Sequence, residues 1–180
     1  MYEPVAETVH VSKCAPRGMI AARGDLSDPS FQRAVSSVLD SDLPGNRQVV
    51  ASKHGLIVWM SPDELLVTCD YDQTDGVIAD LSKALAEQHH LATNVSDARA
   101  TFAIQGAAWR DVLAKGMPVD FRPQSFGEGQ VRRSRLGQVA AAIWMTGVDR
   151  VELVCFRSVG DFVEEWLQMA AQDGSLPDHY

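Results

Sequence analysis

The residues best suited to chemistry are three arginines that lie close together in the chain. Arg132, Arg133 and Arg135 form a basic cluster in a sequence with 16 basic and 24 acidic residues and a formal net charge of −8. On a β-strand, Arg133 and Arg135 would share one face and Arg132 the other, so at least one face should meet water. A charged edge strand that resists aggregation and a contact with an acidic partner or an anionic ligand are both open interpretations. These three arginines are the candidate partner-contact residues.

A second polar pair, Asp97 and Arg99, falls in the turn between two predicted strands. An aspartate in a turn usually accepts a hydrogen bond from the nearby main chain, and this interpretation is favoured over a ligand contact.

The cysteines and histidines do not show the spacing of a catalytic or metal site. Cys14, Cys69 and Cys155 are far apart and lack a C-x-x-C pair, and the last two end apolar runs, which predicts buried thiols that pack as small hydrophobes. The five histidines lack the spacing of metal ligands, and the sequence has neither a glycine-rich phosphate loop nor a G-x-S-x-G motif. We therefore predict no catalytic, cofactor-binding or metal-ligating residue in this chain.

The bulk composition is that of a soluble globular protein. Of 180 residues, 46% are hydrophobic and 22% charged, which is ordinary for such proteins. The negative net charge argues against binding to nucleic acid or to an anionic membrane, because both need basic surfaces. No apolar run reaches the roughly 18 residues of a membrane-spanning helix, and the first residues lack the apolar stretch of a signal peptide. We expect a cytoplasmic protein.

The first half of the chain has the pattern strand, helix, strands, helix, strand. Asp28 followed by Pro29 predicts a helix start, with the aspartate as N-cap and the proline in the first turn. Apolar residues at 31, 34, 35, 38 and 39 give that helix one buried stripe. Strands are predicted at 19–22, 48–52, 55–60, 64–69 and 91–96, and a second helix is predicted to start after Asp72 or Thr74 as its cap. This order is typical of a split β-α-β unit with helices packed on a sheet.

The second half repeats this rhythm less completely. A short helix with Trp109 is predicted to end at Gly116, because glycine takes a positive φ at low cost. The strongest helical stripe of the chain follows Ser158 and contains Trp166. With Trp59 and Trp144 there are four tryptophans on apolar stripes or strands, most expected in the core, although an exposed subset would suit an interface. Strands are predicted at 101–105, 130–136, 138–145 and 150–155.

These patterns predict an α+β fold without a linker that would separate independent domains. Residues 1–16 are expected to form a flexible N-terminal lead-in, residues 17–171 a single α+β domain with halves of about 17–97 and 98–171, and residues 172–180 a tail.

Four short motifs resemble those of a known family. They are W-M-S-P-D-E from Trp59, V-S-D-A-R from Val95, the segment Gly106–Asp120, and F-R-S from Phe156 with its tryptophan-containing helix. Together they resemble the γ-subunit family of heterotetrameric sarcosine oxidase and, more distantly, the folate-binding fold of the glycine-cleavage T-protein, an aminomethyltransferase. The family often has Gly-Pro where this sequence has Gly106-Ala107, a change with little expected effect on structure.

The resemblance implies two split β-α-β-like halves with mixed or antiparallel sheets and helices packed on them. It implies a non-catalytic subunit of a heterotetramer that oxidatively demethylates sarcosine to glycine. The one-carbon unit would pass to tetrahydrofolate or leave as formaldehyde, with formation of H₂O₂. FAD, FMN, NAD, zinc and tetrahydrofolate would belong to the alpha, beta and delta subunits, with alpha the expected direct contact.

Two other functions stay open. The chain could be a stand-alone folate-binding or one-carbon-transfer protein, which would need a pocket carboxylate such as Asp97 or Asp120. It could also be the equivalent subunit of a related N-methyl amino acid dehydrogenase, for example one that acts on N-methylglutamate.

Overall fold

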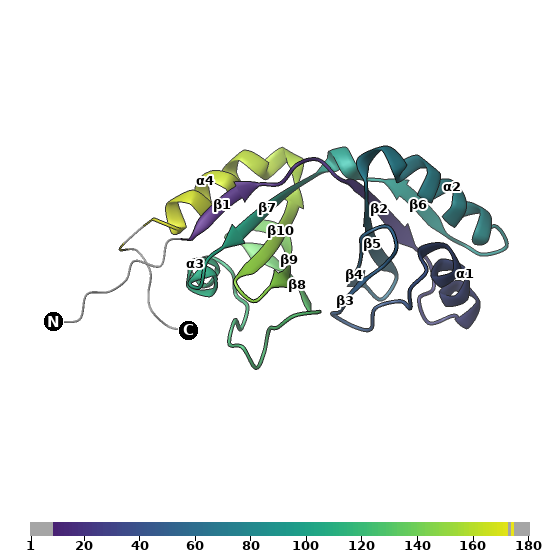
Figure 1. Ribbon diagram of the computed structural model, residues 1–180, viewed down its shortest axis with the longest axis horizontal. Coiled ribbons are helices and arrows are strands. Elements are labelled where there is room, and N and C mark those ends of the chain that lie inside the picture. The colour runs from purple at the N-terminus through teal and green to yellow at the C-terminus, as the bar shows by residue number, and fades with distance from the viewer. Residues whose placement is uncertain (1–8, 173, 175–180) are drawn as a thin grey trace. The chain divides into compact units, whose positions relative to one another are not determined.

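The chain folds as two compact units, in a computed structural model that describes residues 9–172 and residue 174 (Figure 1). The continuous unit is Pro16–Ala98, and the split unit combines residues 9–15 with the chain from Arg99 onward. This division lies one residue from the predicted junction of the two halves. Most of the predicted C-terminal tail, residue 173 and residues 175–180, lies outside the described residues.

The continuous unit is a five-stranded antiparallel sheet with two helices, and its strand order is β3-β4-β5-β2-β6. Its elements are β2 (Gly18–Arg23), α1 (Pro29–Leu39), β3 (Val49–Ala51), β4 (Leu56–Ser61), β5 (Glu64–Cys69), α2 (Thr74–Ala84) and β6 (Leu91–Asn94). All five strands and both helices occur where the sequence predicts them.

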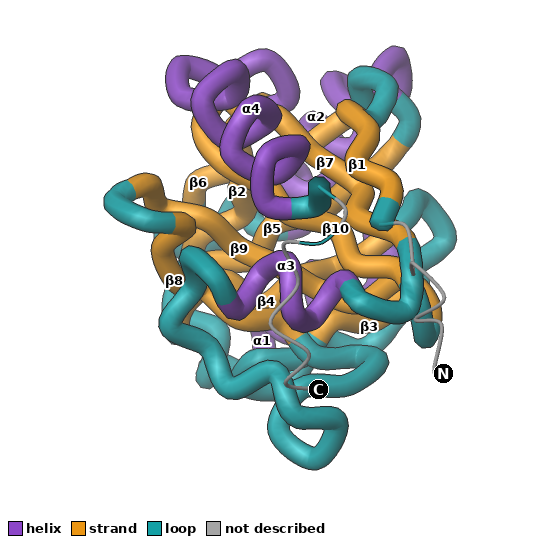
Figure 2. Tube along the Cα trace, turned by 90° about the vertical axis from the view of Figure 1, so that its left-hand side faces the viewer, coloured by secondary structure: helices purple, strands orange, loops and turns teal. Residues whose placement is uncertain are grey.

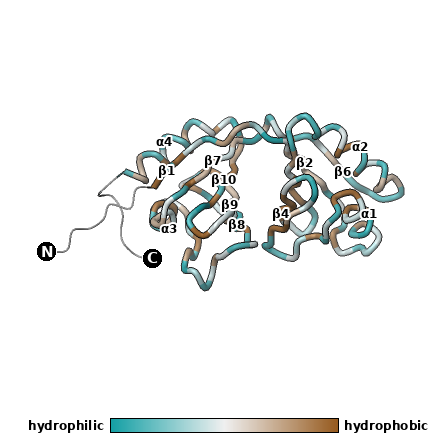
Figure 3. Tube along the Cα trace, in the orientation of Figure 1, coloured by the Kyte–Doolittle hydropathy of each residue, from teal (hydrophilic) through white to brown (hydrophobic). Residues whose placement is uncertain are grey.

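Local chemistry explains α1 in detail. The Asp28 carboxylate accepts a hydrogen bond from the Ser30 amide at 2.8 Å, and Pro29 occupies the first helical position. Phe31, Val35 and Leu39 are fully buried against the sheet, while hydrophilic residues alternate with them along the helix (Figure 3). The predicted helix start and apolar stripe are confirmed.

The split unit is also a five-stranded antiparallel sheet, ordered β1-β7-β10-β9-β8. Its elements are β1 (His10–Lys13), β7 (Arg99–Gln105), α3 (Trp109–Ala114), β8 (Val131–Leu136), β9 (Val139–Gly147), β10 (Arg150–Phe156) and α4 (Gly160–Ala170). Helices α3 and α4 lie over one face of this sheet (Figure 2). The predicted α+β class with antiparallel sheets and packed helices is confirmed.

Strand β1 differs from the predicted lead-in over residues 1–16. Residues 1–8 lie outside the described residues, but His10–Lys13 pair antiparallel with β7, from His10 opposite Gln105 to Lys13 opposite Phe102 (Figure 1). The described part of the lead-in is therefore ordered. Its pairing partner lies some ninety residues further along the chain, which no local pattern reveals.

Aromatic rings fill the core of the split unit beside α3. The rings of Trp109, Phe121 and Phe126 meet edge to face in pairs, with centroids 5.9 to 6.0 Å apart. Phe121 and Phe126 belong to the loop between α3 and β8, so this loop is part of the core rather than a surface excursion.

The end of α3 differs from its prediction. Among the described glycines, positive φ occurs at Gly106, Gly129, Gly137 and Gly174, and Gly116 is absent from that set. Gly116 is needed for another reason, because a Cβ atom there would come within 2.3 Å of the Trp166 ring. Close approach of α4, rather than a left-handed turn, accounts for this glycine.

None of the helices in the described part of the chain is long and apolar enough to cross a membrane.

Candidate partner interface

The three arginines of the basic cluster all lie on β8, and the strand separates them as predicted. Arg132 is opposite Ile143 on the face that carries the helices, whereas Arg133 and Arg135 are opposite Ala142 and Ala140. Arg133 and Arg135 are exposed, and Arg132 is half-buried.

Arg132 has a structural role. Its guanidinium donates to the Gln130 side-chain oxygen at 2.7 Å, to the Val131 carbonyl at 2.9 Å and to the Ser125 carbonyl, and it lies 5.3 Å from the Phe126 ring centroid. These contacts tie the loop before β8 to the strand. Of the three candidates, Arg133 and Arg135 are the two with exposed side chains.

Arg110 supports the same loop, although nothing in the sequence pattern marks it. Its guanidinium donates to the carbonyls of Phe121 and Phe126, the second at 3.0 Å, and lies 4.3 Å from the Trp109 ring centroid. Burial lowers the pKa of this group. Two arginines thus hold the α3–β8 loop through its main-chain carbonyls.

Asp97 and Arg99 each contact an aromatic side chain that is distant in the sequence. The Tyr71 hydroxyl donates to Asp97 at 2.9 Å, and the Arg99 guanidinium lies 4.2 Å from the centroid of the half-exposed Phe156 ring. Asp97 sits in a short 3-10 turn, Ser96–Ala98.

Asp120 is likewise held within its own loop. Its carboxylate accepts hydrogen bonds from the Arg122 guanidinium, the shortest 2.6 Å, and from the Ser125 hydroxyl at 2.7 Å. The Arg122 hydrogen bonds, followed by that from Ser125, hold the pKa of Asp120 below its ordinary value. Asp97 and Asp120, the two carboxylates considered for folate, are both exposed.

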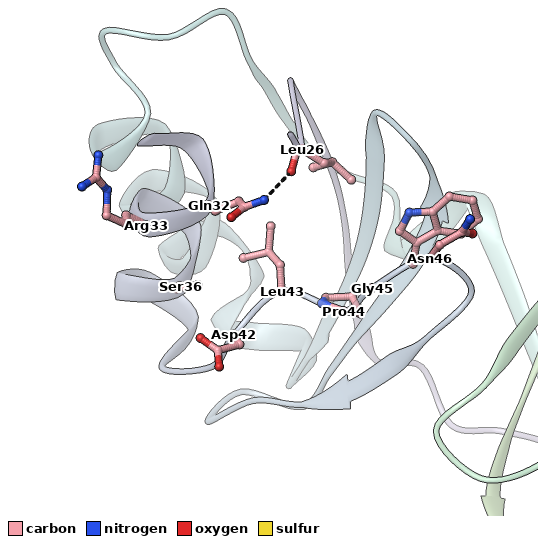
Figure 4. A pocket seen from close by; sticks show the side chains of 10 residues that line it. Leu26, Gln32, Arg33, Ser36, Asp42, Leu43, Pro44, Gly45 and Asn46 are labelled. Carbon is pink, nitrogen blue, oxygen red and sulfur yellow. Dashed lines mark hydrogen bonds between the residues drawn. The ribbon is translucent and has the colours of Figure 1, made fainter. Parts of the chain in front are cut away.

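A hollow of about 520 Å³ lies in the continuous unit (Figure 4). Its polar side chains are partly committed to the main chain, since Gln32 donates to the Leu26 carbonyl at 2.8 Å and Arg33 to the Pro29 carbonyl at 3.2 Å. Arg33 points away from the other labelled side chains in Figure 4. The lining residues are Leu26, Gln32, Arg33, Ser36, Asp42, Leu43, Pro44, Gly45, Asn46 and Trp59.

The four tryptophans divide evenly between full burial and partial exposure, whereas the sequence predicts most of them in the core. Trp109 and Trp144 are fully buried, whereas Trp59 and Trp166 are half-buried. Trp166 packs on the core of the split unit, and Trp59 borders the hollow.

Two of the three thiols, those of Cys69 and Cys155, behave as buried hydrophobes, whereas Cys14 is half-buried. Cys69 and Cys155 are buried without disulfides, and burial raises the pKa of both, that of Cys155 to about 11. Within residues 9–172 and 174, no group of three or more His, Cys, Asp and Glu side chains could hold a metal ion.

Comparison with solved structures identifies the class of fold. The chain is similar to the glycine-cleavage aminomethyltransferase T of Bartonella henselae, with a TM-score of 0.68 and 15% identity over 92% of this chain and 49% of that chain. It is more similar to a chain of the heterotetrameric sarcosine oxidase of Corynebacterium sp. U-96, with a TM-score of 0.84 and 21% identity over 96% of this chain and 88% of that one. Both likenesses show a shared aminomethyltransferase-type fold.

The sequence comparison then gives the family. Residues 23–173 match the model of the sarcosine oxidase, gamma subunit family, and the chain belongs to this family. A curated relative, the sarcosine oxidase subunit gamma of Corynebacterium sp. (strain U-96), is 24% identical over 122 residues. That match covers 68% of this chain and 58% of the relative's length.

Proposed function

We propose that this chain is the gamma subunit of a heterotetrameric sarcosine oxidase and acts by assembly rather than by catalysis. The single observation that carries the proposal is the family match, which begins in β2 and continues past α4, so that it includes both units. The similarity in fold to a chain of the Corynebacterium complex supports it.

The proposed complex oxidises the N-methyl group of sarcosine and yields glycine. Two electrons from the substrate reduce O₂ to H₂O₂, and the one-carbon unit is taken up by tetrahydrofolate or released as formaldehyde. FAD, FMN, NAD, zinc and tetrahydrofolate are assigned to the alpha, beta and delta subunits, with alpha as the direct neighbour of this chain. A cytoplasmic location belongs to the same proposal.

Surface chemistry supports a binding role for this chain. Phe156, Phe162 and Met169 of the split unit are each about half exposed, and Arg133 and Arg135 add positive charge to the same unit. Large apolar side chains with arginine are characteristic of protein interfaces.

The test is to co-express the chain with the open reading frames that flank it and to identify the purified complex by mass spectrometry. We expect the chain to co-purify with alpha, beta and delta subunits in a complex that forms H₂O₂ when sarcosine is added. Without this chain, the complex should not be stable. A chain that stays monomeric in the presence of these partners would contradict the proposal.

The same material tests the two alternatives. Calorimetric titration of the isolated chain with tetrahydrofolate should give no binding heat, whereas saturable binding would favour a stand-alone folate protein. Replacing sarcosine by N-methylglutamate in the activity assay distinguishes an N-methyl amino acid dehydrogenase from a sarcosine oxidase.

A further inference from the structure

Helix α4 carries apolar side chains on two different sides. Val163, Leu167 and Ala170 are buried where the helix packs on the sheet of the split unit (Figure 2). Phe162 and Met169 lie seven positions apart, so they are only about 20° from each other around the helix axis. They are 50% and 59% exposed, on a side turned roughly 120° from the buried stripe. A surface helix usually has polar residues on its outer side.

Trp166 extends this outer side toward α3. It is half-buried, because part of its ring lies against the main chain at Gly116. In the helix it is one turn after Phe162 and one turn before Met169, so the three side chains are neighbours. We call Phe162, Trp166 and Met169 the α4 surface. Aromatic and methionine side chains gathered in this way are typical of the centre of a protein interface.

The other α-helices in the described part of the chain lack this feature. Helices α1 and α2 also bury one apolar stripe each, but large apolar residues are absent from their exposed positions. These positions are Pro29, Gln32, Arg33 and Ser37 on α1, and Asp75, Gly76, Ala79, Asp80, Lys83 and Ala84 on α2. The second apolar side is thus particular to α4 and is not a general property of the helices in this fold.

Charge limits what can cover the α4 surface. Helix α4 contains Asp161, Glu164 and Glu165 but no lysine, arginine or histidine. Glu165 is exposed and borders the surface, three positions after Phe162 and four before Met169. A second copy docked about a two-fold axis through the surface would bring two Glu165 side chains together, and this contact between like charges disfavours self-association. A basic side chain at the same place would form an ion pair with Glu165.

We propose that the α4 surface docks on an apolar patch of a partner subunit that places a lysine or arginine opposite Glu165. This inference rests on the proposed assembly function and adds to it the surface and the chemistry of the partner. Apolar contact with Phe162, Trp166 and Met169 supplies most of the affinity, whereas the charge of Glu165 selects the partner and its orientation.

Hydroxyl-radical footprinting of the co-expressed complex tests the location directly. We expect Met169 to be oxidised as slowly as Met117, which is buried in the core of the split unit, and much more slowly than in the urea-unfolded chain. Fast oxidation of Met169 within an intact complex would overturn the inference and leave the proposed function standing. Absence of any complex would overturn both. Protection of Met169 that appears in the chain alone and grows with its concentration would assign the surface to a second copy and contradict a partner subunit.

The variant Phe162→Gln tests the apolar contact. The dissociation constant follows from the fraction of complex that retains the chain over a dilution series, and we expect it to rise about tenfold. The matched control is Leu91→Gln, because Leu91 of the continuous unit is likewise 50% exposed. Both variants should fold normally, since exposed substitutions usually change stability little. Equal affinity of the two variants would contradict docking through α4.

The variant Glu165→Lys tests the charge of the partner. The helix should remain stable, because the new lysine lies four positions after Asp161 and can pair with it. We expect weaker binding that no longer depends on salt in the way of the wild type, whose dissociation constant should rise with salt concentration. Asp80→Lys, at an exposed position of α2, makes the same change in charge and should bind normally. A Glu165→Lys chain that binds as tightly as the wild type would overturn the basic partner.

Discussion

Gly116 lies against the indole of Trp166, so closely that a Cβ atom at position 116 would be 2.3 Å from the ring. Gly116, two residues after the end of α3, thus lets α4 approach the main chain. We expect Gly116→Ala to destabilise the protein by about 1–3 kcal/mol, because the buried side of the Trp166 ring must shift. Chemical denaturation monitored by tryptophan fluorescence measures this loss.

Gly76→Ala is the matched control. Gly76 is exposed within α2 and has open space around the position of a Cβ atom. Alanine should stabilise this helix by about 0.5–1 kcal/mol. A Gly116→Ala protein as stable as the wild type would contradict the close packing described for α4.

Arg110→Met should loosen the loop between α3 and β8. The substitution keeps the apolar stem but removes the donors to the carbonyls of Phe121 and Phe126. Hydrogen bonds to a charged group contribute about 1.5–3 kcal/mol, so we expect a loss near the upper end of that range. Urea unfolding gives the free energy, and limited proteolysis should show faster cleavage within residues 117–130.

The control for this loss is Arg33→Met, an exposed arginine on α1 whose side chain also bonds a main-chain carbonyl. Exposed substitutions of this kind usually change stability by less than about 0.5 kcal/mol. Similar losses for the two variants would argue against a special role for Arg110.

Acid titration should reveal the environment of Asp120. Hydrogen bonds from Arg122 and Ser125 lower the pKa of this carboxyl from 3.8, so its contribution to stability is present above pH 3.8 and disappears as the pH falls through the lower folded-state value. Carbon-detected NMR should show Asp120 still ionised at pH 3. Arg122→Gln should return the pKa toward 3.8, and an unchanged titration curve in that variant would refute the assigned cause.

Thiol labelling should distinguish the three cysteines. Burial raises the pKa of Cys155 to about 11 and also raises that of Cys69, so few thiolates exist at pH 8 and both sulfurs are covered. Cys14 is only partly buried. Iodoacetamide at pH 8 should therefore modify Cys14 in the folded protein and the other two only after unfolding, as mass spectrometry of tryptic peptides would show. Rapid labelling of Cys155 in the native state would be inconsistent with its burial.

Elements with a strong local signal could be predicted from the sequence. Helix α1 is an example, because its start at Asp28-Pro29 and its apolar stripe from Phe31 to Leu39 both lie within one short segment of the sequence. The separation of Arg132 from Arg133 and Arg135 also follows from the two-residue period of a strand.

Features that depend on distant residues could not be predicted. Strand β1 has four residues with little apolar alternation, and its order comes from pairing with β7. That β8 is an edge strand depends on the strand order of the whole sheet, and the reason for Gly116 depends on Trp166, fifty residues away. In each case the residues that determine the structure are far apart in the sequence, so the local pattern alone does not reveal the contact.

The pairing of β1 with β7 has a consequence for synthesis on the ribosome. The continuous unit needs only residues 16–98, so it can complete its sheet as soon as that segment has left the exit tunnel. The first strand of the split unit, by contrast, must wait for its neighbour until after Gln105 has emerged, with an entire folded unit already between them. Closing so long a loop is less demanding when the intervening chain is already compact. The order of the polypeptide thus favours a fixed sequence of events, in which the inserted unit folds first and brings the two segments of the other unit together.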